Sequence, residues 1–138
     1  MNPNIITSSE DDVKMFLDEL RNVLTSENFD LEADLDILLK KKSELSTDPF
    51  TTGNTMLALD IDREDVRDEL LKLTTSDYYE TFIDDKDSTL SYFYAFLKQV
   101  KSKDVYIKVK IRDKKNNKVF CVSFHFPRYS LHTNPYQV

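Results

Sequence analysis

The residues best suited to chemistry lie between positions 104 and 126, in the stretch DVYIKVKIRDKKNNKVFCVSFHF. Apolar and polar residues alternate in both halves of this stretch, which predicts two strands that each bury one face and leave the other open. The open face of the first strand would carry Tyr106, Lys108, Lys110 and Arg112. The second strand would bury Phe120, Val122, Phe124 and Phe126 and leave Cys121, Ser123 and His125 on the open face. Such a face would suit single-stranded RNA, because cations bind phosphates and aromatic rings stack on unpaired bases.

His125 could titrate near neutral pH and serve as an acid or a base, although a structural role for a surface histidine fits the same sequence. If RDKKNNK forms a hairpin turn, either Tyr106 or Lys108 lies opposite His125, depending on the length of the turn. A third strand can add further residues to the open face. These are Tyr94, Phe96 and Lys98.

The charges of the chain are divided unevenly along its length. Residues 1–97 hold 23 of the 25 acidic residues and 9 of the 19 basic ones, a net charge of −14. Residues 98–138 hold 10 basic and 2 acidic residues, a net charge of +8. This asymmetry fits a C-terminal region that meets a polyanion, and it fits equally well a set of basic strands that are simply solvated.

Composition excludes several classes of protein. Gly53 is the single glycine, so the chain has no glycine-rich phosphate loop and no dinucleotide fingerprint. Cys121 has no partner for an internal disulfide, and the one cysteine and two histidines show no metal-site spacing. No apolar run approaches a membrane span, and the N-terminus does not resemble a signal peptide. We therefore expect a cytoplasmic protein without a cofactor, a metal ion or a membrane partner.

The elements that would position these residues can be predicted along the chain. Ser9 should cap a helix that extends to about residue 24, and Asp62 should cap a second helix. Residues 29–37 alternate between apolar and acidic side chains, which predicts a strand with a solvated carboxylate face better than it predicts a metal site. Residues 43–55 should form a loop. Three strands should follow, at 90–98, 105–112 and 118–126.

This order predicts an α+β fold, in which two helices pack on a mainly antiparallel sheet of about four strands. The length of 138 residues favours one domain spanning 1–138.

The motifs DVYIKVKI, VFCVSFH and the closing NPY, with SDYYETF upstream, resemble the MqsR family of bacterial type II toxins, which have the RelE-like ribonuclease fold. The resemblance is clearest over residues 56–138. It implies an endoribonuclease that cleaves single-stranded mRNA without metal or cofactor and that a protein antitoxin neutralises. The reaction would be attack of a 2′-hydroxyl on the adjacent phosphate. The oligomeric state is not indicated. The same sheet could alternatively serve a noncatalytic relative as a binding platform.

The resemblance also implies roles for individual residues. Tyr106 of VYIK and Tyr79 of SDYYETF match functional tyrosines of the family, and His125 follows VSF where a basic residue is expected. Lys98 resembles a family lysine and, with Lys108, would stabilise the phosphate. The RNA-binding residues would be Lys108, Lys110, Arg112 and Tyr94.

One position departs from the family pattern. Glu80 stands where better-known members have a lysine, and it could act as a base or mark a changed activity. Another histidine, His132, lies in the SLHTNPY tail, where it is expected to be exposed, although it could reach the site.

Overall fold

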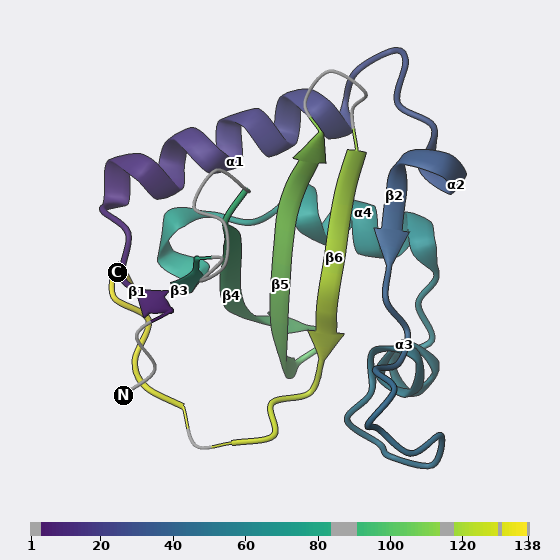
Figure 1. The fold of residues 1–138 in the computed structure, drawn as a ribbon. Helices are drawn as coiled ribbons and strands as arrows, with labels where there is room; N and C mark the ends of the chain where they lie inside the picture. Colours follow the sequence, from purple (N-terminus) through teal and green to yellow (C-terminus); the bar gives the residue numbers. More distant parts are fainter. Residues whose placement is uncertain (1–3, 84–90, 114–117, 130, 138) are drawn as a thin grey trace.

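The computed structural model describes residues 4–83, 91–113, 118–129 and 131–137 (Figure 1). Within these residues, six strands form one sheet in the spatial order β1-β3-β4-β5-β6-β2. Their bounds are β1 Ile5–Ile6, β2 Leu35–Ile37, β3 Tyr78–Phe82, β4 Phe93–Val100, β5 Lys103–Asp113 and β6 Lys118–His125. Every neighbouring pair is antiparallel except β2 and β6. The α+β class is confirmed, and β1 and β3 add to the expected strands.

The helices of the described residues are α1 Glu10–Leu24, α2 Leu31–Asp34, α3 Thr52–Leu59 and α4 Arg63–Leu71, followed by a short 3-10 turn, η1 Thr75–Asp77. Both predicted helix starts are confirmed. The Ser9 hydroxyl accepts the backbone N–H of Asp12, and the Asp62 carboxylate accepts that of Asp65. These bonds satisfy N–H groups that the first turn of a helix leaves unpaired. None of the helices in the described ranges is long and apolar enough to cross a membrane.

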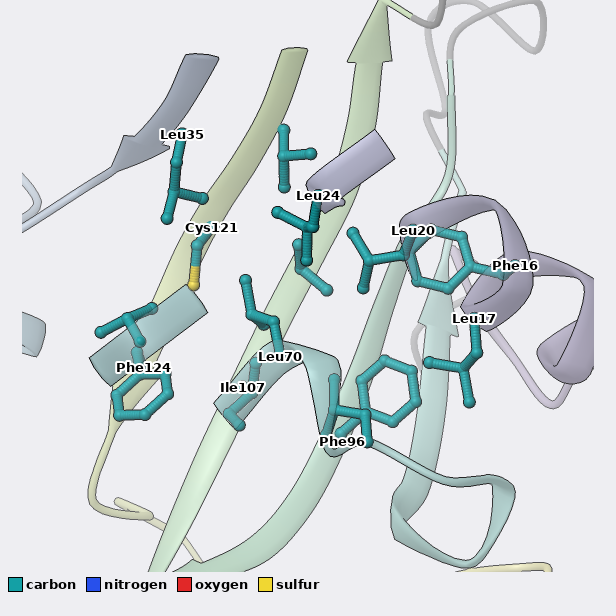
Figure 2. Close-up of a cluster of buried hydrophobic side chains, with 14 of the residues drawn as sticks. Phe16, Leu17, Leu20, Leu24, Leu35, Leu70, Phe96, Ile107, Cys121 and Phe124 are labelled. Carbon is teal, nitrogen blue, oxygen red and sulfur yellow. The ribbon is translucent and has the colours of Figure 1, made fainter. Parts of the chain in front are cut away.

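The core lies between the sheet and the helices α1 and α4 (Figure 2). Leu20 of α1 and Leu70 of α4 are buried beside Phe96 of β4 and Ile107 of β5. The alternate residues of β5 that include Ile107 all face this core, as predicted. The residues between them face the other way. We call this second side the open face of the sheet.

The acidic stretch 29–37 does not form the single strand that its alternation predicts. Asp30 instead caps α2 by accepting the N–H of Glu32, and its own N–H donates to the Asp34 carboxylate. Only Leu35–Ile37 continue as a strand. Short bonds from aspartate side chains to the backbone compete with extended structure, and a period of two along the sequence does not reveal them.

The helix α3 begins inside the stretch 43–55 that was predicted to be a loop. Its threonines Thr52 and Thr55 accept the backbone N–H groups of Phe124 and Phe126. Because β2 ends before this part of β6, these hydroxyls satisfy strand N–H groups that β2 does not reach.

A β-bulge in β6 changes which of its residues reach the open face. Lys108 pairs with Ser123, but the next residue of β5, Val109, pairs with Cys121. Val122 is therefore an extra residue on β6, and the alternation of side chains shifts by one position there.

The bulge divides the prediction for β6 into a correct and a wrong part. After the bulge, Phe124 is buried in the core and His125 lies on the open face, as predicted. Before the bulge the prediction is wrong, because Cys121 is fully buried and Phe120 lies on the open face beneath Arg112.

Candidate active site

A cavity of about 730 Å³ lies on the open face, where β3, β5 and β6 meet two irregular segments. One segment joins β2 to α3. The other, which we call the C-terminal segment, comprises the described residues after His125 (126–129 and 131–137) and runs from β6 past β1 (Figure 1). The lysines, arginine and carboxylates that line the cavity are Lys41, Lys108, Arg128, Glu44, Asp48 and Glu80. Positive and negative side chains are equal in number, so the wall is close to neutral while His125 is uncharged.

Tyr106 and His125 are direct cross-strand neighbours in the cavity. They are paired in the register of β5 and β6, and their ring centroids are 5.7 Å apart. Of the two residues predicted to lie opposite His125, the structure thus selects Tyr106. The Nδ1 atom of His125 is 2.9 Å from the carbonyl oxygen of Phe126. Burial lowers the pKa of His125 below 6.5, although this hydrogen bond opposes the effect.

Glu80 reaches the same cavity because β3 contains a second bulge. The pairing with β4 shifts between Tyr78 and Glu80, so both Tyr79 and Glu80 line the cavity although they are consecutive in sequence. The Tyr106 hydroxyl donates to Glu80 Oε2 over 3.2 Å. Burial, followed by the negative charge of Glu80, raises the pKa of Tyr106, so this phenol keeps its proton at all ordinary pH values.

Lys108 lies two residues from Tyr106 on the same face of β5. Its ammonium nitrogen is 3.5 Å from the centroid of the Phe82 ring, which also lines the cavity. Burial, followed by the nearby charge of Lys41, lowers the pKa of Lys108 from 10.5 to about 8, and the negative charge of Glu80 opposes this shift. The side chain is therefore charged at pH 7 but gives up its proton more readily than an ordinary lysine.

The C-terminal segment brings His132 to the rim of the cavity. Its ring stacks on Tyr79 at 3.7 Å between centroids and an interplanar angle of 8°, and its backbone N–H donates to the Tyr79 hydroxyl. Its Nε2 atom lies 3.6 Å from Glu80 Oε1. His132 is thus exposed, as expected, and also adjacent to the site. Asn134 and Tyr136 hold the segment in place through bonds to backbone carbonyls.

Arg128 joins the two irregular walls of the cavity. Its guanidinium group donates to Glu44, and to Asp48 over 2.8 Å. Burial would raise the pKa of Glu44, but hydrogen bonds from the Lys41 backbone and from Arg128 hold it below its ordinary value. The backbone N–H of Phe50 and then Arg128 lower the pKa of Asp48. No motif in the sequence pointed to these residues, which meet only through folding.

Comparison with known families shows which family the chain belongs to. The model of a family described as "Motility quorum-sensing regulator, toxin of MqsA" matches residues 32–126, well over half of the chain. The chain belongs to the MqsR toxin family. As a member it is the toxin of a toxin-antitoxin system, and a cognate antitoxin is its partner. No curated protein matches the chain.

The MqsR match covers most of the cavity. Tyr79, Glu80, Tyr106 and His125 all fall inside the matched residues, whereas His132 lies in the segment beyond them. The C-terminal wall of the cavity therefore lies outside the matched residues.

Two predicted site residues lie on the wrong side of the sheet to share this cavity. Lys98 and Tyr94 pair with Val105 and Val109, both of which face the core, so their side chains lie on the helix side. Lys98 forms an ion pair with Glu69 of α4 at 3.0 Å. The side chain of Lys98 is only 12% exposed and that of Glu69 only 15%.

Tyr94 also lies on the helix side of the sheet. Its ring stacks on Phe16 of α1 at 4.1 Å, and Phe96, which was predicted beside it on the open face, is fully buried in the core. Aromatic residues occupy both faces of β4, so its sequence does not indicate which face is buried.

The other predicted residues lie where expected. Lys110 and Arg112 follow Lys108 along the open face, outside the cavity. In the described ranges, no group of three His, Cys, Asp or Glu side chains is arranged to hold a metal ion.

Proposed function

We propose that this toxin is an endoribonuclease that cleaves single-stranded mRNA in the cytoplasm, by attack of a 2′-hydroxyl on the adjacent phosphate and without a metal ion. The observation that carries the proposal is the pairing, in one cavity, of an imidazole of lowered pKa with a lysine of lowered pKa. Phosphodiester cleavage of this kind needs a base, an acid and a positive charge near the phosphate. His125 and Lys108 can supply all three.

His125 is the general base in this proposal. A carbonyl oxygen can only accept a hydrogen bond, so the contact with Phe126 places the proton of the neutral ring on Nδ1. The Nε2 atom then keeps its lone pair and can take the proton of the 2′-hydroxyl. The lowered pKa of His125 keeps the ring in this neutral form at pH 7.

Lys108 supplies the charge and the acid. It is the diagonal neighbour of His125 across β5 and β6, a separation of about 7–8 Å between Cα atoms that leaves room for a phosphodiester between the side chains. Its ammonium group would stabilise the extra negative charge of the attacked phosphate and protonate the departing 5′-oxygen. The products would be a 2′,3′-cyclic phosphate and a 5′-hydroxyl.

Tyr106 has a positioning role in this scheme. Loss of its proton would create a phenolate next to the Glu80 carboxylate, which the raised pKa of Tyr106 makes unfavourable. Its hydroxyl and ring instead fix Glu80 and His125 in place.

A noncatalytic binding module is the second candidate, and Glu80 is the observation that favours it. This carboxylate lines the cavity together with Glu44 and Asp48. Arg128 pairs with Glu44 and Asp48, but the charge of Glu80 would repel an RNA phosphate, whereas it would suit a partner that presents cations. On this view the open face binds a protein or RNA without cleaving it.

The test is cleavage of a long unstructured RNA by the purified wild type and by His125→Ala, with EDTA present and with the cut ends mapped. We expect the wild type to produce 5′-hydroxyl ends and the variant to produce none. Tyr92→Leu, a change of an exposed ring on the helix side, is the control and should cleave normally. Absence of cleavage by the wild type would favour the noncatalytic module.

A further inference from the structure

A row of cations and aromatic rings continues from the cavity along the open face. Lys110 lies over the Phe93 ring at 4.6 Å, and Arg112 lies over the Phe120 ring at 4.1 Å. The two rings contact each other edge to face at 5.9 Å. We call Lys110, Arg112, Phe93 and Phe120 the aromatic strip.

The aromatic strip is continuous with the proposed catalytic cavity. Lys108 lies in the cavity wall, yet its ammonium group is also 5.2 Å from the Phe93 ring. From Lys108 to Arg112 the strand β5 rises about 13 Å, at about 3.3 Å per residue. About four stacked nucleotides, at roughly 3.4 Å each, have the same length.

The aromatic strip lies outside the hydrophobic core. Phe93 and Phe120 are only partly buried, and they belong to the face opposite α1 and α4. The bulge in β6 is what places Phe120 on this face, because regular alternation would have put it in the core. Solvent-facing aromatic rings next to cations form the kind of surface on which unpaired bases stack.

The cations of the strip are available to a phosphate chain. Arg112 forms an ion pair with Asp36 at 3.3 Å, but both side chains are about half exposed, so water screens this pair and a polyanion can replace it. Lys110 contacts Phe93, and a cation held over a ring keeps its full charge.

We propose that the aromatic strip is a subsite for unpaired nucleotides that flank the cleaved phosphate. The rings of Phe93 and Phe120 would stack on successive bases, while Lys110 and Arg112 would move from the rings to the phosphates. Base-paired RNA would bind poorly, because its bases are already stacked and cannot reach the rings. The inference rests on the proposed RNA substrate, and it assigns this face to RNA instead of to a protein.

The experiment measures affinity for a fluorescent single-stranded RNA whose mapped cleavage site carries a 2′-O-methyl group, so that binding is read without cleavage. Phe120→Leu should weaken binding at least fivefold, given typical stacking energies per base. Lys110→Ala combined with Arg112→Ala should reduce the slope of log affinity against log salt by about 1.4, at about 0.7 per phosphate contact on a single strand. An RNA duplex of the same length should bind the wild type and Phe120→Leu equally weakly, because its bases cannot reach the ring.

Two controls isolate the aromatic strip. Lys103→Ala removes an exposed lysine at the other end of β5, and Tyr92→Leu removes an exposed ring on the helix side. Neither should change the affinity or the salt slope. If the strip variants bind the single strand as tightly and with the same salt slope as the wild type, the strip is not a nucleotide subsite.

The outcome is independent of catalysis. If the wild type cut no RNA, the same strand without the 2′-O-methyl group would serve as the ligand. Weaker binding of that strand by the strip variants would still support the subsite, and only the proposed activity would fail. Conversely, cleavage by a wild type whose strip variants bind and cleave normally would retain the activity and overturn the subsite.

Discussion

Replacing Lys108 with methionine should make the protein more stable and inactive. Methionine keeps the length of the side chain and its contact with Phe82 but carries no charge. Burial lowers the pKa of Lys108 from 10.5 to about 8, and each unit corresponds to 1.36 kcal/mol, so the charged side chain destabilises the fold by at most about 3.4 kcal/mol. Partial solvent access reduces this figure, and the attraction between the ammonium group and the Phe82 ring offsets about 0.5–2 kcal/mol. We expect Lys108→Met to increase the free energy of unfolding by about 1–2 kcal/mol at pH 7.

The pH dependence of this difference is a sharper test than its size. Below pH 8 Lys108 is charged in both the folded and the unfolded protein, so the full destabilisation is present. Between pH 8 and 10.5 the unfolded chain binds more protons at this position than the folded protein does, so the stability of the wild type rises with pH relative to the variant. The advantage of Lys108→Met should therefore shrink across this range and vanish near pH 10.5.

Urea unfolding of both proteins at pH 7, 9 and 10.5 would measure the difference. Lys110→Met is the matched control, because Lys110 lies on the same face of the same strand and over a ring but outside the cavity. It should change stability by less than about 0.5 kcal/mol, as is usual for surface substitutions. If Lys108→Met is less stable than the wild type at pH 7, or if the difference does not depend on pH, the argument that burial of this charge is costly is wrong.

Three further predictions concern the site and the core. The single-turnover rate of RNA cleavage should rise with pH as His125 loses its proton below pH 6.5, and it should fall above about pH 8 as Lys108 loses its proton. A rate that stays flat from pH 7 to 10 would contradict the roles of the two residues. Arg128→Gln should lower the melting temperature at pH 7, because the two carboxylates that hold Arg128 have lowered pKa values and contribute stability while they are ionised. This loss should shrink as the pH falls below about 4 and the folded protein takes up protons at Glu44 and Asp48; a loss that is the same at every pH would contradict the ionic role of Arg128. Cys121 should resist thiol reagents in the native protein, because it is buried and burial raises its pKa to about 12. Cys121→Ser should lower the free energy of unfolding in urea by about 1–3 kcal/mol, because it buries a hydroxyl. Rapid labelling of Cys121 without unfolding would show that the core side of β6 becomes accessible in the native protein.

The sequence predicts β5 and its pairing with β6 well, because the alternation of apolar and polar residues in β5 is compatible with only one buried face. In β5, strict alternation of β-branched residues with Tyr106, Lys108 and Lys110 leaves a single choice of buried face. The pairing of Tyr106 with His125 then requires only a hairpin. Helix starts at Ser9 and Asp62 are equally readable, since their side chains satisfy the first turn locally.

Bulges and distant contacts explain what the sequence does not reveal. The extra residue Val122 exchanges the buried and open sides of the first half of β6. A similar shift in β3 brings the side chains of both Tyr79 and Glu80 into the cavity. Neither bulge can be recognised from the sequence, because no glycine or proline lies at the shifted position. Arg128 meets its carboxylates about 80 residues away, so only the folded chain brings this wall of the cavity together.

The most direct test of the central claim is cleavage of an RNA in which the single nucleotide before a mapped cut carries a 2′-deoxyribose. The account predicts that the wild-type protein still binds this RNA and still cuts its other sites, but that cleavage at the substituted position disappears, because no 2′-hydroxyl is present there to attack the phosphate. Continued cleavage at that position would contradict the proposed reaction and, with it, the role of His125 as the base.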